Sequence, residues 1–118
     1  MSQNPAQPAP GTAICALSDL PNMGAKGFTY RLTTAIFQGF ILREGEHVRG
    51  YVDRCPHAGW PLSVLPDRYL TKDGKFLMCS SHGALFLKDN GECISGPCVG
   101  DHLSTWPVLV EDGVVTAA

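Results

Sequence analysis

Two short segments of the chain each combine a cysteine with a histidine. The first holds Cys55 and His57, and the second holds Cys79 and His82. A thiolate and an imidazole only a few residues apart can be presented by one loop to the same metal centre. Such donors suit iron–sulfur clusters, zinc or copper, and they suit calcium or magnesium poorly. The two segments therefore indicate a transition-metal site.

Two cysteines and two histidines leave two inorganic groups open. One is a tetrahedral zinc ion, and the other is a [2Fe-2S] cluster in which two histidines replace two cysteines on one iron. Zinc fingers usually group cysteine with cysteine and histidine with histidine, whereas each segment here holds one of each. This mixing favours the cluster, because each segment can give its cysteine to one iron and its histidine to the other. Spacing alone does not separate the two groups, so zinc stays open.

Three further cysteines need no metal. Cys15 falls in an expected strand and is read as a small buried hydrophobe. Cys93 and Cys98 flank a Gly-Pro segment and could form a redox pair, but four ligands already complete a cluster. We therefore expect them to pack against the loop near the cluster. His47 and His102 have no cysteine nearby in the sequence and are read as surface or strand histidines.

Length and charge limit the range of functions. The 118 residues suffice for one domain, so the chemistry has to come from a single site. The formal net charge is −2, and the sequence contains no block of like charges. It therefore offers no basic stripe for a phosphate backbone and no polybasic membrane anchor. Neither nucleic acid nor a membrane is expected as a partner.

The first eleven residues contain three prolines among polar residues and alanines. Residues 1–11 are predicted to be a disordered tail, with neither the pattern of a signal peptide nor that of a transmembrane helix. Residues 12–118 are predicted to form one domain. The default expectation is a cytoplasmic location, where five cysteines are better explained by metal binding than by disulfides.

Strands fit the hydrophobic pattern better than helices do. No stretch sustains the helical spacing of apolar residues, and glycine or proline interrupts nearly every ten residues. A helical turn is expected over 19–21, a loop over 22–27, and hairpin turns over 43–46 and 111–113. Many short strands with glycine-rich turns indicate an all-β sandwich or barrel. The predicted strands are 13–17, 35–42, 47–52, 76–78, 84–87, 103–110 and 114–116.

The two ligand segments resemble the loops of a known family. Residues 55–62 and 79–86, followed by Gly91 and by Gly96-Pro97, resemble the Rieske domain in its ferredoxin-like form. The likeness runs from about residue 52 to residue 110. It implies an antiparallel β-sandwich with a small cluster-binding subdomain, expected at about residues 53–100.

The resemblance also implies one [2Fe-2S] cluster and a role for each ligand. Cys55 and Cys79 would hold the inner iron, while His57 and His82 would hold the outer, more exposed iron. The implied function is that of a one-electron carrier and not an enzyme, passing electrons from a flavin reductase to a ring-hydroxylating oxygenase. Docking of these partners is expected near the two histidines and Trp60. The alternatives are a small Rieske subunit of a larger reductase, such as assimilatory nitrite reductase, and a structural zinc module.

Four positions distinguish this chain from the Rieske proteins of respiratory complexes. Those proteins carry one further cysteine in each ligand loop, and the two form a disulfide; the matching residues here are Trp60 and Ser81. They also place serine and tyrosine hydroxyls near sulfur, where this chain has Ala84 and Phe86. Hydrogen bonds to sulfur favour the reduced cluster. We therefore predict a potential near the bottom of the Rieske range of about −150 to +300 mV.

Overall fold

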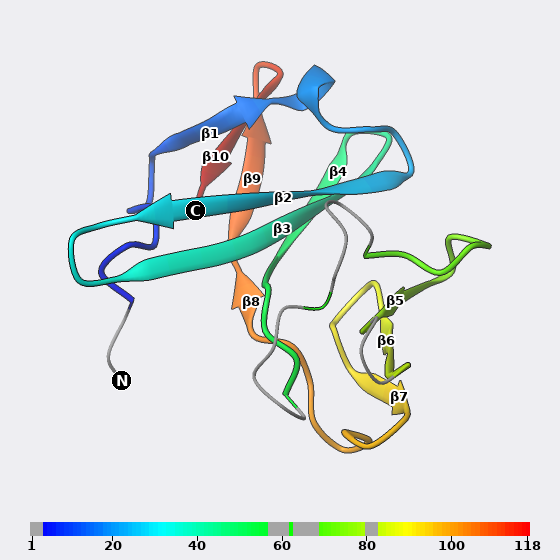
Figure 1. The fold of residues 1–118 in the computed structure, drawn as a ribbon. Helices are drawn as coiled ribbons and strands as arrows, with labels where there is room; N and C mark the ends of the chain where they lie inside the picture. The colour runs from blue at the N-terminus through cyan, green and yellow to red at the C-terminus, as the bar shows by residue number, and fades with distance from the viewer. Residues whose placement is uncertain (1–3, 57–61, 63–68, 80–82) are drawn as a thin grey trace.

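The computed structural model describes residues 4–56, 62, 69–79 and 83–118. Within these residues the chain forms ten β-strands and one turn of 3-10 helix, Leu17–Asp19 (Figure 1). The strands are β1 (Ala13–Ala16), β2 (Gly24–Arg31), β3 (Ile36–Glu44), β4 (His47–Val52), β5 (Phe76–Met78), β6 (Leu85–Leu87), β7 (Cys93–Ser95), β8 (Thr105–Trp106), β9 (Val108–Glu111) and β10 (Val114–Ala117).

The strands pair in three antiparallel sheets. Their orders are β1-β10-β9, β2-β3-β4-β8 and β5-β6-β7. The first two sheets pack together as a sandwich, and the third forms a small subdomain beside it (Figure 1). The chain leaves the sandwich after β4, builds the subdomain, and returns at β8. This confirms the predicted all-β sandwich with an inserted subdomain.

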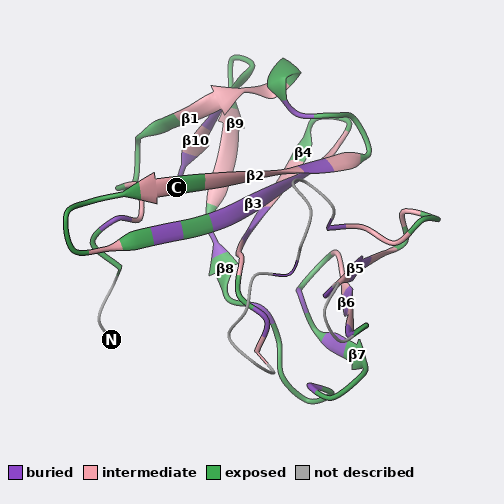
Figure 2. Ribbon diagram, viewed as in Figure 1, coloured by how far each residue is buried: buried purple, intermediate pink, exposed green. Residues whose placement is uncertain are grey.

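Trp106 is the centre of the sandwich core. Its side chain is fully buried and meets three aromatic rings edge to face, those of Phe28, Tyr30 and Phe37, at centroid distances of 6.2, 6.3 and 5.0 Å. A methyl group on Gly39 would lie 2.5 Å from the indole Cε3, so glycine makes room for the ring. The buried residues run through the middle of β3, while the tip of its hairpin with β2 is exposed (Figure 2).

Both hairpins expected at the ends of the sandwich are confirmed. β3 and β4 are joined by a two-residue turn at Gly45, whose φ is +64°. β9 and β10 are joined at Asp112 and Gly113, whose φ values of +51° and +75° suit the positive-φ turns that match strand twist. Arg43 and Glu44, expected in the first turn, instead extend β3.

The loop prediction for residues 22–27 is wrong for residues 24–27, because β2 begins at Gly24. Two glycines and a lysine lower the strand propensity of this segment. Pairing overrides that propensity, since β2 faces β3 without interruption from Gly24 opposite Arg43 to Arg31 opposite Ile36. The helical turn expected over 19–21 also lies earlier, at Leu17–Asp19.

The strand predicted over residues 103–110 is divided in two by Pro107. β8 pairs with β4, whereas β9 pairs with β10, so the chain passes from one sheet to the other at the proline. Proline has no N–H to donate and is poorly tolerated inside a paired strand. The short strand β7 was not predicted, and it forms by pairing with β6.

The N-terminal segment contacts the sandwich from Asn4 onward. The Asn4 amide donates a hydrogen bond to the carbonyl of Ile36 at 2.8 Å, Ala6 is buried, and the Gly11 N–H donates to the carbonyl of Ala117 at 2.8 Å. This part of the expected disordered tail is therefore held against β3 and β10. Among the residues described, no helix is long and apolar enough to cross a membrane.

Candidate metal centre

Cys55 lies just beyond the end of β4. The backbone on its N-terminal side is held by two hydrogen bonds, from the Val52 N–H to the Ser104 carbonyl at 2.8 Å and from the Asp53 N–H to the Gln38 carbonyl at 2.9 Å. The Cys55 side chain has no exposed surface. The sandwich therefore fixes where the first ligand loop starts.

Cys79 directly follows β5 and begins the loop that leads to β6. Its N–H donates to the Ala84 carbonyl at 2.9 Å, and the Gly83 N–H donates to the Cys79 carbonyl at 2.8 Å. Gly83 has a φ of +71°, a conformation that glycine adopts without steric cost. These hydrogen bonds join the two ends of the second ligand loop. His82 of this loop lies outside the described residues.

The structure brings the two predicted cysteine ligands into one buried cluster. Cys55 and Cys79 are both fully buried and share this cluster with Phe40, Tyr69 and Phe86, among others. His57, Trp60, Ser81 and His82 lie outside the described residues. The assignment of Cys55, His57, Cys79 and His82 as ligands stays a prediction. The positions of the two described residues among them, Cys55 and Cys79, are compatible with a single metal centre.

Asp53 ties the first ligand loop to the subdomain. Its carboxylate accepts a hydrogen bond from the Leu62 N–H at 2.8 Å and another from the Tyr69 hydroxyl at 3.2 Å. Burial raises the pKa of the Asp53 carboxyl, and these two hydrogen bonds partly oppose the shift. Because Leu62 closes the loop that begins after Cys55, this carboxylate holds both ends of that loop together.

Cys93 and Cys98 belong to the same buried cluster as the predicted ligands. The Cys98 thiol donates a hydrogen bond to the Cys93 sulfur, and the two sulfurs are 2.7 Å apart. Burial raises the pKa of Cys98 to about 12, with Cys93 and then Cys55 adding to the shift. Cys93 and Cys98 are thus buried together with the two predicted cysteine ligands. Their direct contact was not expected, although their spacing around a Gly-Pro turn allows it.

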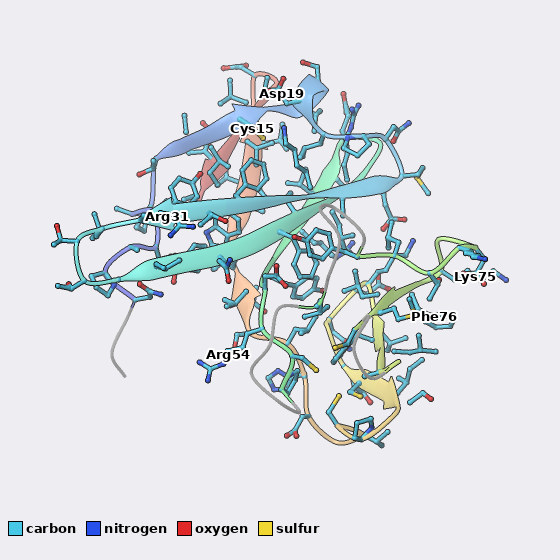
Figure 3. The ribbon with its side chains drawn as sticks, in the orientation of Figure 1. Cys15, Asp19, Arg31, Arg54, Lys75 and Phe76 are labelled. Carbon is cyan, nitrogen blue, oxygen red and sulfur yellow. The ribbon has the colours of Figure 1, made fainter. Side chains whose placement is uncertain are left out.

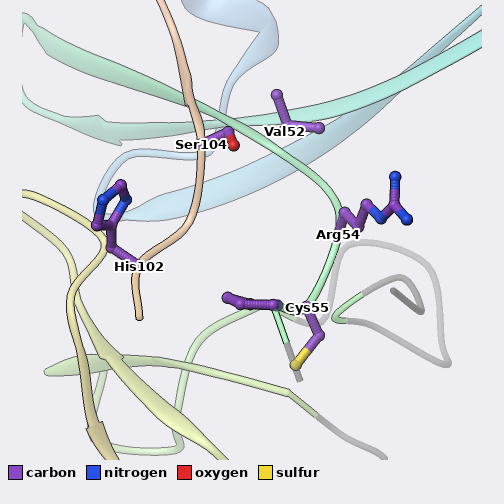
Figure 4. A pocket seen from close by; sticks show the side chains of 6 residues that line it. Val52, Arg54, Cys55, His102 and Ser104 are labelled. Carbon is purple, nitrogen blue, oxygen red and sulfur yellow. The ribbon is translucent and has the colours of Figure 1, made fainter. Parts of the chain in front are cut away.

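A pocket of about 310 Å³ lies on the backbone side of Cys55. Figure 4 shows His102 and Ser104 across from the Cys55 segment, with the Cys55 sulfur directed away from Ser104. The sulfur therefore does not point into this pocket, which we do not assign to the metal. Its lining residues are Val52, Arg54, Cys55, Pro56, His102 and Ser104.

The donor chemistry of the described residues fits the sulfur side of an iron–sulfur cluster. Two thiols from two different loops are withdrawn from water into one apolar environment, where cluster thiolates are commonly held. Backbone hydrogen bonds fix the loop ends that carry both thiols. The two cysteines thus lie at the starts of two loops beside a β-sandwich, in one buried environment that suits a metal–sulfur group.

The comparison with protein families agrees with this fold and site. Residues 12–107 match the Rieske [2Fe-2S] domain, so the chain belongs to the Rieske [2Fe-2S] family. Its cofactor is one Rieske-type [2Fe-2S] cluster, and the zinc alternative is set aside. No curated protein sequence matches the chain.

Solved structures with the same fold include ferredoxins. The ferredoxin of carbazole 1,9a-dioxygenase from Nocardioides aromaticivorans IC177 matches with a TM-score of 0.70 and 17% identity, covering 93% of this chain and 98% of that chain. The Sphingomonas yanoikuyae B1 ferredoxin matches with a TM-score of 0.66 and 20% identity, covering 91% and 96%. A chain from a complex of reduced oxygenase and oxidized ferredoxin in carbazole 1,9a-dioxygenase matches with a TM-score of 0.68 and 26% identity, covering 90% of each chain.

Proposed function

We propose that this chain carries single electrons to the terminal oxygenase of a ring-hydroxylating system. The observation that carries the proposal is the match, over nine-tenths of both chains, to a chain from an oxygenase–ferredoxin complex. The chain is an electron-transfer component and not an enzyme in its own right. In the proposed site Cys55 and Cys79 bind the inner iron, and His57 and His82 bind the outer one.

The protein's own residues contribute burial and positioning to this function. When bound, the cluster accepts and releases one electron. Cys55 and Cys79 are withdrawn from water; the Asp53 carboxylate accepts a hydrogen bond from Leu62 in the first loop, and backbone hydrogen bonds join Cys79 to Gly83 and Ala84 in the second. A flavin reductase is proposed as the electron donor. A cytoplasmic location is part of the proposal, because a reducing compartment keeps cysteines available for iron.

Two buried residues beside the second ligand loop support a low potential. Ala84 and Phe86 are fully buried, and neither side chain has a hydrogen-bond donor to offer to sulfur. Fewer hydrogen bonds to sulfur leave the reduced, more negative cluster less stabilised. A low potential suits an electron donor to an oxygenase better than an electron acceptor from a quinol.

We expect the midpoint potential to lie near the lower end of the Rieske range, about −150 mV. A redox titration followed by electron paramagnetic resonance of the dithionite-reduced protein measures it and reports the mixed histidine and cysteine ligation in the same sample. A midpoint above about +100 mV would reject the low-potential assignment. A protein whose reduced form gives no Rieske-type signal would reject the ligand set.

We propose that partners dock near His57, Trp60 and His82. In a Trp60→Ala variant with an intact cluster, the rate of electron transfer to a terminal oxygenase is expected to fall, because tryptophan is a common anchor of protein interfaces. Leu32→Ala is the matched control, since Leu32 is 55% exposed in the β2–β3 turn, far from the subdomain (Figure 1). Equal rates for both variants would place the docking face elsewhere.

The competing assignment is a small subunit of a larger reductase, such as assimilatory nitrite reductase. Mixing the reduced protein with a terminal oxygenase separates the two functions. We expect the cluster to be reoxidised as the oxygenase turns over its aromatic substrate. Failure of that transfer, together with co-purification of the chain with a larger reductase, would favour the competing assignment.

A further inference from the structure

The pair formed by Cys93 and Cys98 has no part in binding the cluster as proposed above. We propose that these two cysteines are a modification site, a dithiol that closes reversibly to an intramolecular disulfide beside Cys55. The inference does not depend on the electron-carrier function, because it concerns only the chemistry of these two thiols.

The sulfur atoms are already positioned for bond formation. They are 2.7 Å apart, and a disulfide bond is about 2.05 Å long, so closing the bond needs a small approach and no rearrangement of distant segments. Cys98 directs its thiol hydrogen at the Cys93 sulfur, and Cys93 directs its own at the Ser95 carbonyl, 3.3 Å away. The Cys98 thiol therefore points toward the Cys93 sulfur and not toward an apolar side chain.

The local backbone explains how residues five apart in sequence meet. Cys93 is held in β7 opposite Phe86 of β6, and the chain then turns back at Gly96, whose φ is +98°. A methyl group on Gly96 would lie 2.9 Å from the Ala84 Cα, so the turn is pressed against the second ligand loop. The Asp101 N–H donates to the Cys98 carbonyl at 2.9 Å and holds the far side of the turn.

A small reagent can reach the pair by local opening of this turn. Both sulfurs are buried, but the residues between and beside them are not, since Ile94 is 40% exposed and Val99 is 63% exposed. Within the turn, the Val99 N–H donates a long hydrogen bond of 3.4 Å to the Gly96 carbonyl, and the Asp101 N–H donates one of 2.9 Å to the Cys98 carbonyl. Exposed turns of this kind open at low free-energy cost.

The reaction we propose is thiol–disulfide exchange with a low-molecular-weight disulfide such as oxidised glutathione. One protein thiolate attacks a glutathione sulfur, which forms a mixed disulfide and releases one glutathione thiol. The second protein thiolate then displaces the other glutathione and closes the Cys93–Cys98 bond. Two protein thiols are oxidised to one disulfide, and one glutathione disulfide is reduced to two thiols. The two protons lost by the protein thiols are taken up by the two released glutathione sulfurs. The second step is intramolecular and is therefore favoured over attack by another glutathione.

The position of the pair gives the bond a structural consequence. The Cys93–Cys98 bond would link β7 to the far end of the turn at Gly96, beside Cys55, with which Cys98 interacts.

The test uses the intact, cluster-loaded protein and a mass measurement. The protein is incubated with oxidised glutathione, alkylated, and digested with trypsin. Lys88 is the last lysine or arginine of the chain, so one tryptic peptide, 89–118, contains Cys93 and Cys98 and no other cysteine. We expect this peptide to lose both alkylation sites and two hydrogens, and to regain both sites after dithiothreitol. The visible spectrum recorded before digestion shows whether the cluster stayed bound.

Single replacements provide the controls. Cys98→Ser and Cys93→Ser are each expected to stop at a mixed disulfide or remain unmodified. Cys15→Ser is expected to leave closure unchanged, because Cys15 lies on β1 at the opposite end of the molecule from Phe76 and the subdomain (Figure 3). Two alkylatable thiols in peptide 89–118 of the folded wild-type protein would overturn the proposal, as would a stable glutathione adduct or a cross-link from Cys98 to Cys55.

Discussion

Replacing Cys79 with alanine is expected to abolish cluster binding. The side chain is fully buried at the start of the second ligand loop, and a methyl group cannot replace a thiolate that binds iron. After anaerobic reconstitution the variant should contain no cluster, as measured by iron and sulfide analysis, visible absorption and electron paramagnetic resonance. Cys79 gives a cleaner test than Cys55, because Cys98 interacts with Cys55 and offers a nearby replacement sulfur.

Two controls separate loss of the ligand from loss of the fold. The sandwich core around Trp106 is a separate buried cluster from the one that holds Cys79, so the β-sheet circular dichroism of the variant should persist. Cys15→Ala removes a cysteine of the sandwich and is expected to retain full cluster content. A Cys79→Ala protein with the wild-type amount of iron and sulfide would remove Cys79 from the ligand set.

Replacing Trp106 with alanine is expected to lower the free energy of unfolding by about 3 to 5 kcal/mol. Its ring contacts Phe28, Tyr30 and Phe37 and is fully buried between the two sheets. Truncation leaves a cavity that these rings cannot fill without moving. Domains of this size are stable by about 5 to 15 kcal/mol, so the variant loses a large part of its stability. Urea unfolding followed by circular dichroism measures the change.

Trp106→Phe is the matched variant. Within the described residues the Trp106 Nε1 is buried and has no hydrogen-bond partner, and a buried donor left unpaired costs about 1 to 3 kcal/mol. Phenylalanine removes that donor and keeps most of the ring contacts, so its loss should be clearly smaller than that of alanine. Equal losses for the two variants, or a loss below about 0.5 kcal/mol for alanine, would mean that the indole is not central to the core.

Strands were predictable where local pattern and pairing agree. β4 and β5 have the predicted bounds, His47–Val52 and Phe76–Met78, because both segments are rich in strand-forming residues next to turn residues. β2 was missed although Phe28, Thr29 and Tyr30 are strand formers, because its glycines weaken the local signal in the first half, where pairing with β3 extends the strand. Pro107 was visible in the sequence, but the change of sheet at that residue depends on which strands lie alongside.

The residues of the candidate site also divide into those that the sequence predicted and one that only the structure shows. Residue type and spacing along the sequence predicted Cys55 and Cys79 as ligands, and both can be read without a structure. The carboxylate of Asp53, which joins Leu62 to Tyr69, had no such signal, because an isolated aspartate beside a cysteine is common. Its role depends on hydrogen bonds between segments that are distant in the chain.

The amino-acid sequence alone predicted the donor set of Cys55, His57, Cys79 and His82, and the resemblance of the two ligand loops indicated the family and the cofactor. Metal preference follows from donor atoms and their spacing, and both are covalent properties of the chain. Only the tertiary structure decided that the Cys93 and Cys98 sulfurs meet beside Cys55. Such a contact is made by a turn folding back onto a sheet, and its formation depends on packing that no local pattern specifies.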